Sequence, residues 1–276
     1  MKLVTYSAGS SGATGVGYIE DGEIRSLGGA SMLEYIERGR DADRQPGGSE
    51  AIALEEARLY APVMLPQKVI AIGLNYEDHA AETGAEIPEK PIVFAKYPNT
   101  VVGPGEPIRI PPITEQVDYE AELAVVIGRT AKNVSEEEAL DYVFGYTNSN
   151  DVSSRDLQFS EGGQWTRSKS LDTFAPMGPF IATRDEVPDP QNLSVRCILN
   201  GEVMQDGTTS KMIFSVAQLI SFLSRGMTLV PGDVIMTGTP PGVGFVRDPQ
   251  VFLKSGDEVS IEIEGLGTLT NVVEAE

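Results

Sequence analysis

Hydrophobic and polar residues alternate most clearly over residues 117–127, where the sequence reads VDYEAELAVVI. The valine, tyrosine, leucine and isoleucine residues favour a β-strand, and Gly128 ends the run. Side chains alternate between the two faces of a strand, so the pattern places Asp118, Glu120 and Glu122 on one face. Three carboxylates on one face indicate either a solvated outer face or a buried group that a divalent cation neutralises.

Other short apolar runs, bounded by glycine, proline or charged residues, predict further strands. They cover residues 2–6, 15–20, 23–27, 68–73, 92–96, 195–199, 202–204, 233–236, 258–264 and 267–273. Two tight hairpins are predicted, because Asp21-Gly22 and Asn200-Gly201 each separate two of these runs.

Helical spacing is limited to short segments. Ser31 is suited to cap the first of them, and the pair Ser135 and Glu138 predicts a capping box at the start of another. The predicted helices cover residues 31–38, 75–84, 135–142 and 213–224. Residues 40–50 and 152–170 are polar and are predicted to form loops.

The frequency of glycine and proline narrows the fold class. With 29 glycines and 18 prolines, the chain favours many short strands and turns, which predicts a mixed α/β fold that is mainly β. A length of 276 residues allows one main domain with a small appendage. Residues 1–60, with a hairpin and a helix, are predicted to form a small N-terminal α+β domain, and residues 68–276 the main domain.

Charge and cysteine content exclude several classes of protein. Asp and Glu total 41 against 21 Lys and Arg, and the resulting net charge of -20 disfavours binding to nucleic acid or anionic membranes. The single cysteine, Cys197, excludes an intrachain disulfide and indicates a reducing compartment. The N-terminus lacks the apolar core of a signal peptide, and no run is long enough to cross a bilayer, so a cytoplasmic location is expected.

The candidate metal ligands are oxygen atoms. His79 is the only histidine, which excludes a histidine-rich zinc site and favours Mg²⁺, Mn²⁺ or Ca²⁺. Asp151 follows the apolar run 143–150 and could supply a third carboxylate beside Glu120 and Glu122.

Several other polar residues have both a chemical and a structural interpretation. His79 and Glu82 lie three residues apart on one helical face, either as a general base with its orienting carboxylate or as a solvated surface pair. Lys169 follows an aromatic residue and could hold an anion or be solvated. The segment 237–244, TGTPPGVG, lacks the lysine of a phosphate loop, but the Thr239 hydroxyl and the backbone amides could bind a carboxylate.

Six ordered segments together resemble the fumarylacetoacetate hydrolase family, in the group of acylpyruvate hydrolases and 2-hydroxyhepta-2,4-diene-1,7-dioate isomerases. These segments are residues 72–82, 117–128, 151–159, 165–179, 200–214 and 229–244. The resemblance covers residues 68–276, whereas residues 1–60 match only the variable small domain of such proteins. It implies a mainly β, mixed α/β fold around a rolled β-sheet, and a homodimer.

The resemblance also implies roles for individual residues. Glu120, Glu122 and Asp151 match three ligands of Mg²⁺ or a similar ion. The resemblance assigns no role to Asp118, which we expect to support these ligands. His79 and Glu82 match a catalytic pair that activates water. The residues that match positions in contact with the substrate or around it are Tyr76, Arg155, Gln158, Lys169 and Thr239. Lys169 is also expected to be catalytic.

The activity favoured first is hydrolysis of a C–C bond in a 2,4-dioxo acid of acylpyruvate type, because the His79–Glu82 pair is present. In this reaction a pyruvate enolate leaves onto the metal ion. The alternatives are tautomerisation of 2-hydroxy-dienedioates, decarboxylation of oxaloacetate, dehydration of 2-oxo-3-deoxy sugar acids, and a non-enzymatic protein that binds a 2-oxo acid.

Overall fold

Strands dominate the computed structural model, which describes residues 1–8, 13–28, 31–39, 51–160 and 162–276. Within these ranges the largest sheet contains β1 (Lys2–Ala8), β2 (Gly15–Glu20), β3 (Glu23–Ser26), β4 (Ala51–Ala53), β5 (Ala57–Tyr60), β6 (Val69–Gly73), β7 (Ile92–Lys96), β8 (Val101–Val102), β11 (Ala121–Ile127), β12 (Val143–Asn150), β14 (Ala175–Thr183) and β17 (Val234–Met236). Its main path runs β4-β3-β2-β1-β14-β12-β11-β17-β6-β7, with β5 paired to β1 and β8 to β14.

A second sheet lies against the first. It has the order β16-β15-β18-β19-β9, and its strands are β9 (Ile108–Ile110), β15 (Ser194–Leu199), β16 (Glu202–Thr208), β18 (Glu258–Ile263) and β19 (Thr268–Ala275). Strands β15 and β18 pack on β11 and β12, and every residue of β11 and β12 is buried. These two strands are therefore at the centre of the molecule. The mostly apolar sequence of β11 and of the first half of β12 suits burial on both faces, whereas residues 147–150 of β12 are polar.

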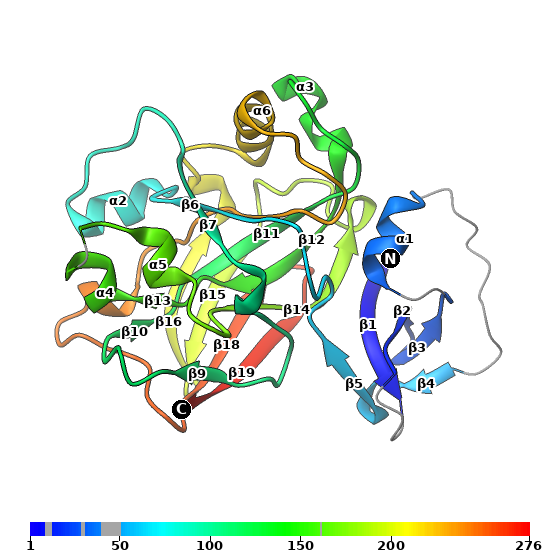
Figure 1. Ribbon diagram of the computed structural model, residues 1–276, viewed down its shortest axis with the longest axis horizontal. Helices are drawn as coiled ribbons and strands as arrows, with labels where there is room; N and C mark the ends of the chain where they lie inside the picture. The colour runs from blue at the N-terminus through cyan, green and yellow to red at the C-terminus, as the bar shows by residue number, and fades with distance from the viewer. Residues whose placement is uncertain (9–12, 29–30, 40–50, 161) are drawn as a thin grey trace.

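Short helices cover the ends of the sheets. They are α1 (Met32–Glu37), α2 (Glu77–Thr83), α3 (Glu136–Ala139), α4 (Arg155–Ser160), α5 (Trp165–Lys169) and α6 (Val216–Gly226), with 3-10 turns η2 (Leu54–Glu56), η3 (Pro98–Thr100), η4 (Leu140–Tyr142), η5 (Arg184–Glu186), η6 (Thr209–Lys211) and η7 (Gly244–Val246). Helices α2, α4 and α5 gather at the left of Figure 1, while α3 and α6 lie side by side at the top. None of the helices in the described ranges is long and apolar enough to span a bilayer.

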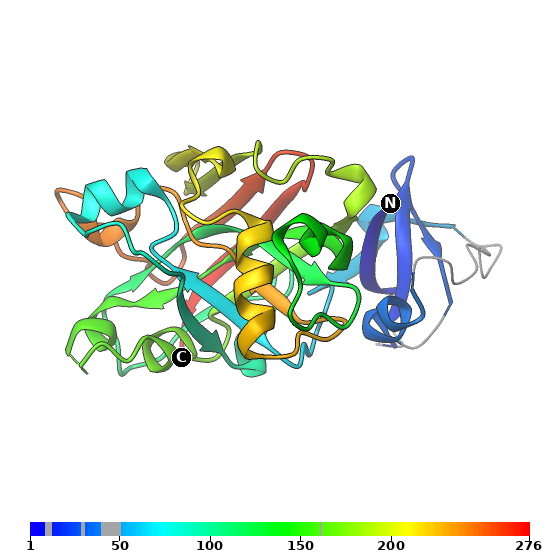
Figure 2. The ribbon, with the colours of Figure 1, turned by 90° about the horizontal axis from the view of Figure 1, so that it is seen from above.

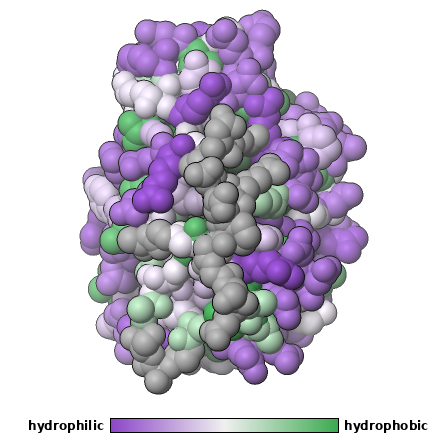
Figure 3. All heavy atoms as spheres, turned by 90° about the vertical axis from the view of Figure 1, so that its right-hand side faces the viewer, coloured by the Kyte–Doolittle hydropathy of each residue, from purple (hydrophilic) through white to green (hydrophobic). Residues whose placement is uncertain are grey.

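Strands β1–β5 and helix α1 group at one end of the long axis, as Figures 1 and 2 show. Figure 3 views this end and shows a mostly hydrophilic surface with scattered apolar residues. Strand β1 also pairs with β14, with Lys2 opposite Ala182 and Leu3 opposite Ile181, so the large sheet continues from this group into the rest of the molecule. A domain boundary after residue 60 stays a prediction.

Most of the predicted elements are present. The mixed, mainly β fold is confirmed, and both hairpins form, with positive φ angles at Asp21 and Asn200 and at the glycines that follow them. The side chain of Ser31 caps α1 by accepting a hydrogen bond from Glu34 N at 3.2 Å. Cys197 is fully buried. The predicted loop 40–50 lies outside the described residues.

Three predictions were wrong. The strand expected over residues 117–127 is interrupted at Tyr119 and Glu120, and its first part, β10 (Val117–Asp118), pairs instead with β13 (Ser153–Ser154). The loop expected over residues 152–170 contains β13, α4 and α5. The capping box at Ser135 is absent, because the Ser135 hydroxyl donates to the Glu138 carboxylate at 3.4 Å and caps no backbone amide.

Asn75, in the loop between β6 and α2, joins three segments that are distant in sequence. Its side-chain nitrogen donates to Phe214 O at 3.0 Å and to Thr237 O at 2.7 Å, and its side-chain oxygen accepts from Phe214 N at 2.8 Å. Asn75 is fully buried, so no water can replace these bonds without a rearrangement. The position at which α2 begins therefore depends on this amide.

We expect Asn75→Ala to lower the free energy of unfolding by about 2–4 kcal/mol, because buried carbonyls and an N–H group lose their partner. Denaturant unfolding measures this change. The matched control is Asn99→Ala, since Asn99 is exposed and its amide bonds are at the surface; its effect should stay within about 0.5 kcal/mol. Equal losses in both variants would contradict the role given to Asn75.

Candidate active site

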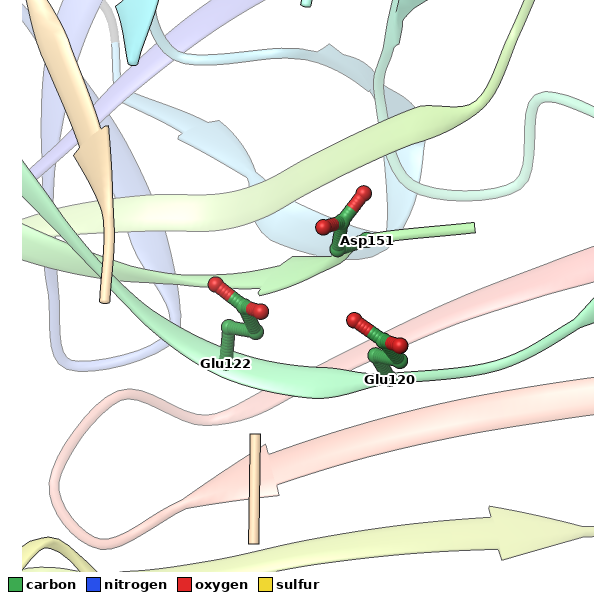
Figure 4. Close-up of side chains that lie close together, drawn as sticks. All are labelled: Glu120, Glu122 and Asp151. Carbon is green, nitrogen blue, oxygen red and sulfur yellow. The ribbon is translucent and has the colours of Figure 1, made fainter. Parts of the chain in front are cut away.

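The pairing of β11 with β12 brings three carboxylates together. Ala121 is opposite Asn150, and one step further the Asp151 N–H donates to Glu120 O at 2.9 Å. Glu122 projects from the same region of β11. One oxygen from each of Glu120, Glu122 and Asp151 lies within 4.8 Å of the others, and all three residues are buried (Figure 4). The grouping expected from the sequence is therefore present.

Basic side chains from three elements contact two of these carboxylates. The Lys169 ammonium donates to Glu120 Oε2 at 2.9 Å and to Asp151 Oδ2 at 2.8 Å. Lys96, on β7, donates to the other oxygen of Asp151, and Arg155 Nη2 donates to Glu120 Oε1 at 2.6 Å. Lys169, Lys96 and Arg155 are all buried, so these charge-assisted bonds are shielded from solvent.

Glu122 has a different environment. Within the described residues it forms no ion pair, and its Oε2 accepts a hydrogen bond from Gly238 N at 2.9 Å. Burial raises its pKa well above the usual value, and the charges of Asp151 and Glu120 add to this effect. For Glu120, burial also acts to raise the pKa, but Lys169 and Arg155 outweigh it and hold the pKa at about 2.

This donor set fits a hard divalent cation. Three buried carboxylate oxygens within reach of one point are ligands that Mg²⁺, Mn²⁺ and Ca²⁺ prefer, and three protein ligands leave further positions for water or substrate. The Tyr76 hydroxyl gives a second indication. It is buried without a hydrogen-bond partner in the described part of the chain, and the charge of Glu122 helps to raise its pKa, after burial itself.

Asp118 is not part of the carboxylate group, although strict alternation predicted that it would share the face of Glu120 and Glu122. The interruption after β10 turns its side chain toward Arg155 Nε, at 2.9 Å, and toward the N–H groups of Gly244, at 2.7 Å, and Phe245, at 3.1 Å. Because Arg155 also binds Glu120, Asp118 orients the guanidinium that touches a candidate ligand. This agrees with its predicted supporting role.

His79 and Glu82 form a pair on α2. His79 Nδ1 lies 2.7 Å from Glu82 Oε1, and the Glu82 carboxylate also accepts a hydrogen bond from Gly242 N at 2.9 Å. The left-handed conformation of Gly84, with φ of 67°, ends the helix directly after the pair. His79 is buried, so the alternative interpretation, a solvated surface pair, does not hold for the histidine.

The loop after β17 supplies backbone amides to these acidic side chains. Gly238 N donates to Glu122, Gly242 N to Glu82 and Gly244 N to Asp118. A Cβ on Gly242 would lie 2.3 Å from Met204 O, and one on Gly244 would lie 1.8 Å from Val251 O, so neither position has space for a side chain. The backbone amides of the glycine-rich loop thus bind carboxylates. These carboxylates are side chains of the protein itself.

A cavity of about 220 Å³ lies above the carboxylates. Its walls include seven of the residues selected from the sequence, which are His79, Glu120, Glu122, Arg155, Gln158, Lys169 and Thr239. Tyr76, expected to line the pocket, is not among its wall residues. The Thr239 hydroxyl donates to Ala121 O at 2.9 Å and accepts from Gln205 Nε2 at 2.8 Å, so it is occupied within the protein.

Arg155 and Gln158 face the site because α4 is helical. Arg155 Nη1 donates to Gln158 Oε1 at 2.9 Å, and the guanidinium carbon lies 4.5 Å from the centroid of the Phe245 ring. A guanidinium has five N–H donors, of which three are used, and two remain for a ligand. Similarly, the Lys169 ammonium uses two of its three donors on carboxylates.

Lys96 is the site residue that sequence reasoning missed. It is 2% exposed and binds both Asp151 and Val152 O, the latter at 3.1 Å. The signal was the alternation in β7, where Phe94 and Lys96 share the buried face and Val93 and Ala95 the exposed one. A lysine on a buried strand face needs an acidic partner, which could have been sought among the predicted ligands.

Comparison with known proteins places this site in a family. Residues 68–274 match the model described as fumarylacetoacetate hydrolase, C-terminal. The mitochondrial oxaloacetate tautomerase of Xenopus laevis is 42% identical over 287 residues, covering 99% of this chain and 90% of that protein. A human mitochondrial oxaloacetate tautomerase is 48% identical over 249 residues, covering 88% of this chain and 79% of its own length.

Solved structures give the same result. A fumarylacetoacetate hydrolase from psychrophilic Exiguobacterium antarcticum superposes with a TM-score of 0.91 at 41% identity, covering 100% of both chains. A 2-hydroxyhepta-2,4-diene-1,7-dioate isomerase from Mycobacterium marinum has a TM-score of 0.83 at 38% identity, covering 100% of this chain and 99% of its own. The chain therefore belongs to the fumarylacetoacetate hydrolase family and has its fold.

Proposed function

We propose that the protein is a tautomerase that interconverts the enol and keto forms of a small 2-oxo dicarboxylic acid such as oxaloacetate. The observation that carries the proposal is a cavity of about 220 Å³ with Lys169, Arg155 and His79 in its walls beside the carboxylate group. The volume of this cavity is below the usual range for drug-sized ligands, so the cavity suits an acid of few carbons. The names of the similar proteins, oxaloacetate tautomerases and a dienedioate isomerase, support this choice over hydrolysis.

Glu120, Glu122 and Asp151 would hold the divalent cation. When bound, such an ion supplies Lewis-acid stabilisation to negative charge that develops on a substrate oxygen. The protein contributes anchoring from behind, since Lys96 binds Asp151 and Arg155 binds Glu120. These contacts keep two of the carboxylates in place before any ligand arrives.

The basic residues would bind the anionic acid. Burial acts to lower the pKa of Lys169, but Asp151 and Glu120 outweigh it and raise the pKa, so the ammonium stays charged. Its remaining N–H donor can bind a carboxylate or enol oxygen of the substrate. Arg155, held by Asp118 and Gln158, offers two further donors to a second oxygen.

His79 would move the proton. In the conversion of enol to keto, the oxygen on C2 loses a proton and C3 gains one. Glu82 fixes His79 through Nδ1, which leaves Nε2 as the ring atom for proton exchange with the substrate. The same orienting carboxylate is itself held by Gly242 N.

Hydrolysis of an acylpyruvate is the second candidate, and one observation favours it. His79, held by Glu82, lies in the cavity wall, where it could equally deprotonate a water molecule for attack on a carbonyl carbon. A homodimer and a cytoplasmic location remain predictions from the sequence.

Replacing His79 separates proton transfer from binding. We expect His79→Ala to lower kcat for enol–keto conversion of oxaloacetate by roughly 100-fold to 10,000-fold, with KM changed little, because the proton carrier is lost. Loss of the enol absorbance measures this reaction. Glu82→Gln should reduce kcat less, since it removes only the orienting charge.

The control is Glu77→Gln, an exposed residue on the same helix, which should leave kcat unchanged. Pyruvate release from acylpyruvates is measured in parallel. A wild-type enzyme that releases pyruvate but does not speed tautomerisation would replace the first candidate with the second, and a fully active His79→Ala variant would remove the pair from both mechanisms.

The raised pKa of Glu122 predicts a pH dependence of Mg²⁺ binding. In metal-free protein the stability contributed by neutral Glu122 is fully present below its ordinary pKa of 4.5 and is lost as pH rises through the raised value. Mg²⁺ must displace this proton, so the increase in Tm caused by Mg²⁺ should grow as pH rises above the ordinary pKa of Glu122 and through its raised value.

Glu122→Gln tests the assignment, because the neutral amide should abolish most of the Mg²⁺-dependent rise in Tm. In the metal-free protein, the same substitution should also remove the loss of stability that accompanies rising pH. Glu202→Gln, at an exposed carboxylate of β16, is the control and should respond to Mg²⁺ like the wild type. A pH-independent response to Mg²⁺ in the wild type would contradict the prediction.

A further inference from the structure

Two hollows meet at one tryptophan. The cavity above the carboxylates, about 220 Å³, lies beside an open groove of about 870 Å³ between β7 and α5. Ile92 and Trp165 are the residues that line both. The wall between the cavity and the groove is therefore built from one strand residue and one indole ring.

Two contacts hold the indole in this wall. A Cβ on Gly73 would lie 2.0 Å from Trp165 Cζ3, so the absence of a side chain at Gly73 lets the ring lie directly against β6. The ring also meets Phe94 edge to face, with centroids 5.5 Å apart. Lys169 follows four residues later on α5, on the same face of the helix, which ties the position of the ring to that of the site.

The two hollows offer different groups to a ligand. The cavity has charged walls, including Glu120, Arg155 and Lys169, which suit the oxygen-rich end of an acid. The groove has the apolar side chains of Val93, Phe94 and Leu171 in its walls, together with polar ones. The polar ones are Gln164, Thr166, Arg167 and Ser170. A substrate with its acid end at the carboxylates and a hydrocarbon tail in the groove would have to pass the indole.

We propose that Trp165 is a specificity-determining residue that limits the protein to short 2-oxo acids by closing the cavity toward the groove. The inference rests on the proposed function for the location of the 2-oxo acid group, and it adds the length of the substrate. Removing the indole joins the two hollows, so that 2-oxo acids with straight alkyl chains extend along β7 and bury their methylene groups against Val93, Phe94 and Leu171.

The test measures binding of straight-chain 2-oxo acids of increasing length to the Mg²⁺-loaded protein by calorimetry, which needs no turnover. The wild type should bind short members and lose affinity as the chain lengthens. Trp165→Ala should reverse this trend, with roughly fourfold tighter binding for each added methylene that enters the groove. Trp165→Phe should retain the wild-type preference, and Trp165→Leu replaces the alanine variant if the latter does not fold.

Val93→Glu supplies the matched control. Val93 lines the groove and not the cavity, and it is 38% exposed, so a charge there should leave binding of short acids unchanged. Added to Trp165→Ala, it should cancel the gain for long chains, because the tail would meet a carboxylate. The same chain-length profile in Trp165→Ala and wild type would overturn this inference alone, whereas a wild type that binds no 2-oxo acid would overturn the proposed function as well.

Discussion

The burial of like charges is the constraint on which this structure depends. Four carboxylates, from Asp118, Glu120, Glu122 and Asp151, lie in the interior with almost no exposure, and three basic side chains neutralise three of them. An unpaired buried charge costs several kcal/mol, so each basic residue must be brought to its partner from elsewhere in the chain. The folding of β7, α4 and α5 around the ends of β11 and β12 satisfies this requirement.

Backbone amides complete the neutralisation. The turn that follows β17 directs N–H groups at Glu122, Glu82 and Asp118, three acidic residues with different roles. A fixed peptide dipole adds polar stabilisation without adding another ionisable group. Among the described residues, Gly238 N is the one hydrogen-bond donor to the Glu122 carboxylate, which leaves Glu122 as the carboxylate best able to exchange a proton for a cation.

Local sequence patterns predicted the individual elements of this arrangement better than they predicted which distant elements pair. Alternation and turn residues predicted both hairpins and the strand that carries Glu122, because these signals depend on neighbouring residues. Asp118 was misplaced because the strand stops at Tyr119, where β10 leaves β11 to pair with β13. Nothing local indicates that pairing. The charge partner of Lys96 was also hidden, since it lies 55 positions away in sequence.

The hairpin of β11 and β12 has its connection at the end remote from Glu120 and Asp151, because Ile127 and Val143 pair next to the turn. The segment between these two residues holds α3, which packs on α6, and buries Ala131, Val134 and Ala139. Its exposed residues can therefore change in number during evolution without altering the distance between the two acids, provided that these contacts and the strand register are kept. In this architecture the chemistry lies at the end of the strand pair remote from the connection, and the exposed residues of the connection, such as 135–138, are available for grafting, for example of a tag or a reporter.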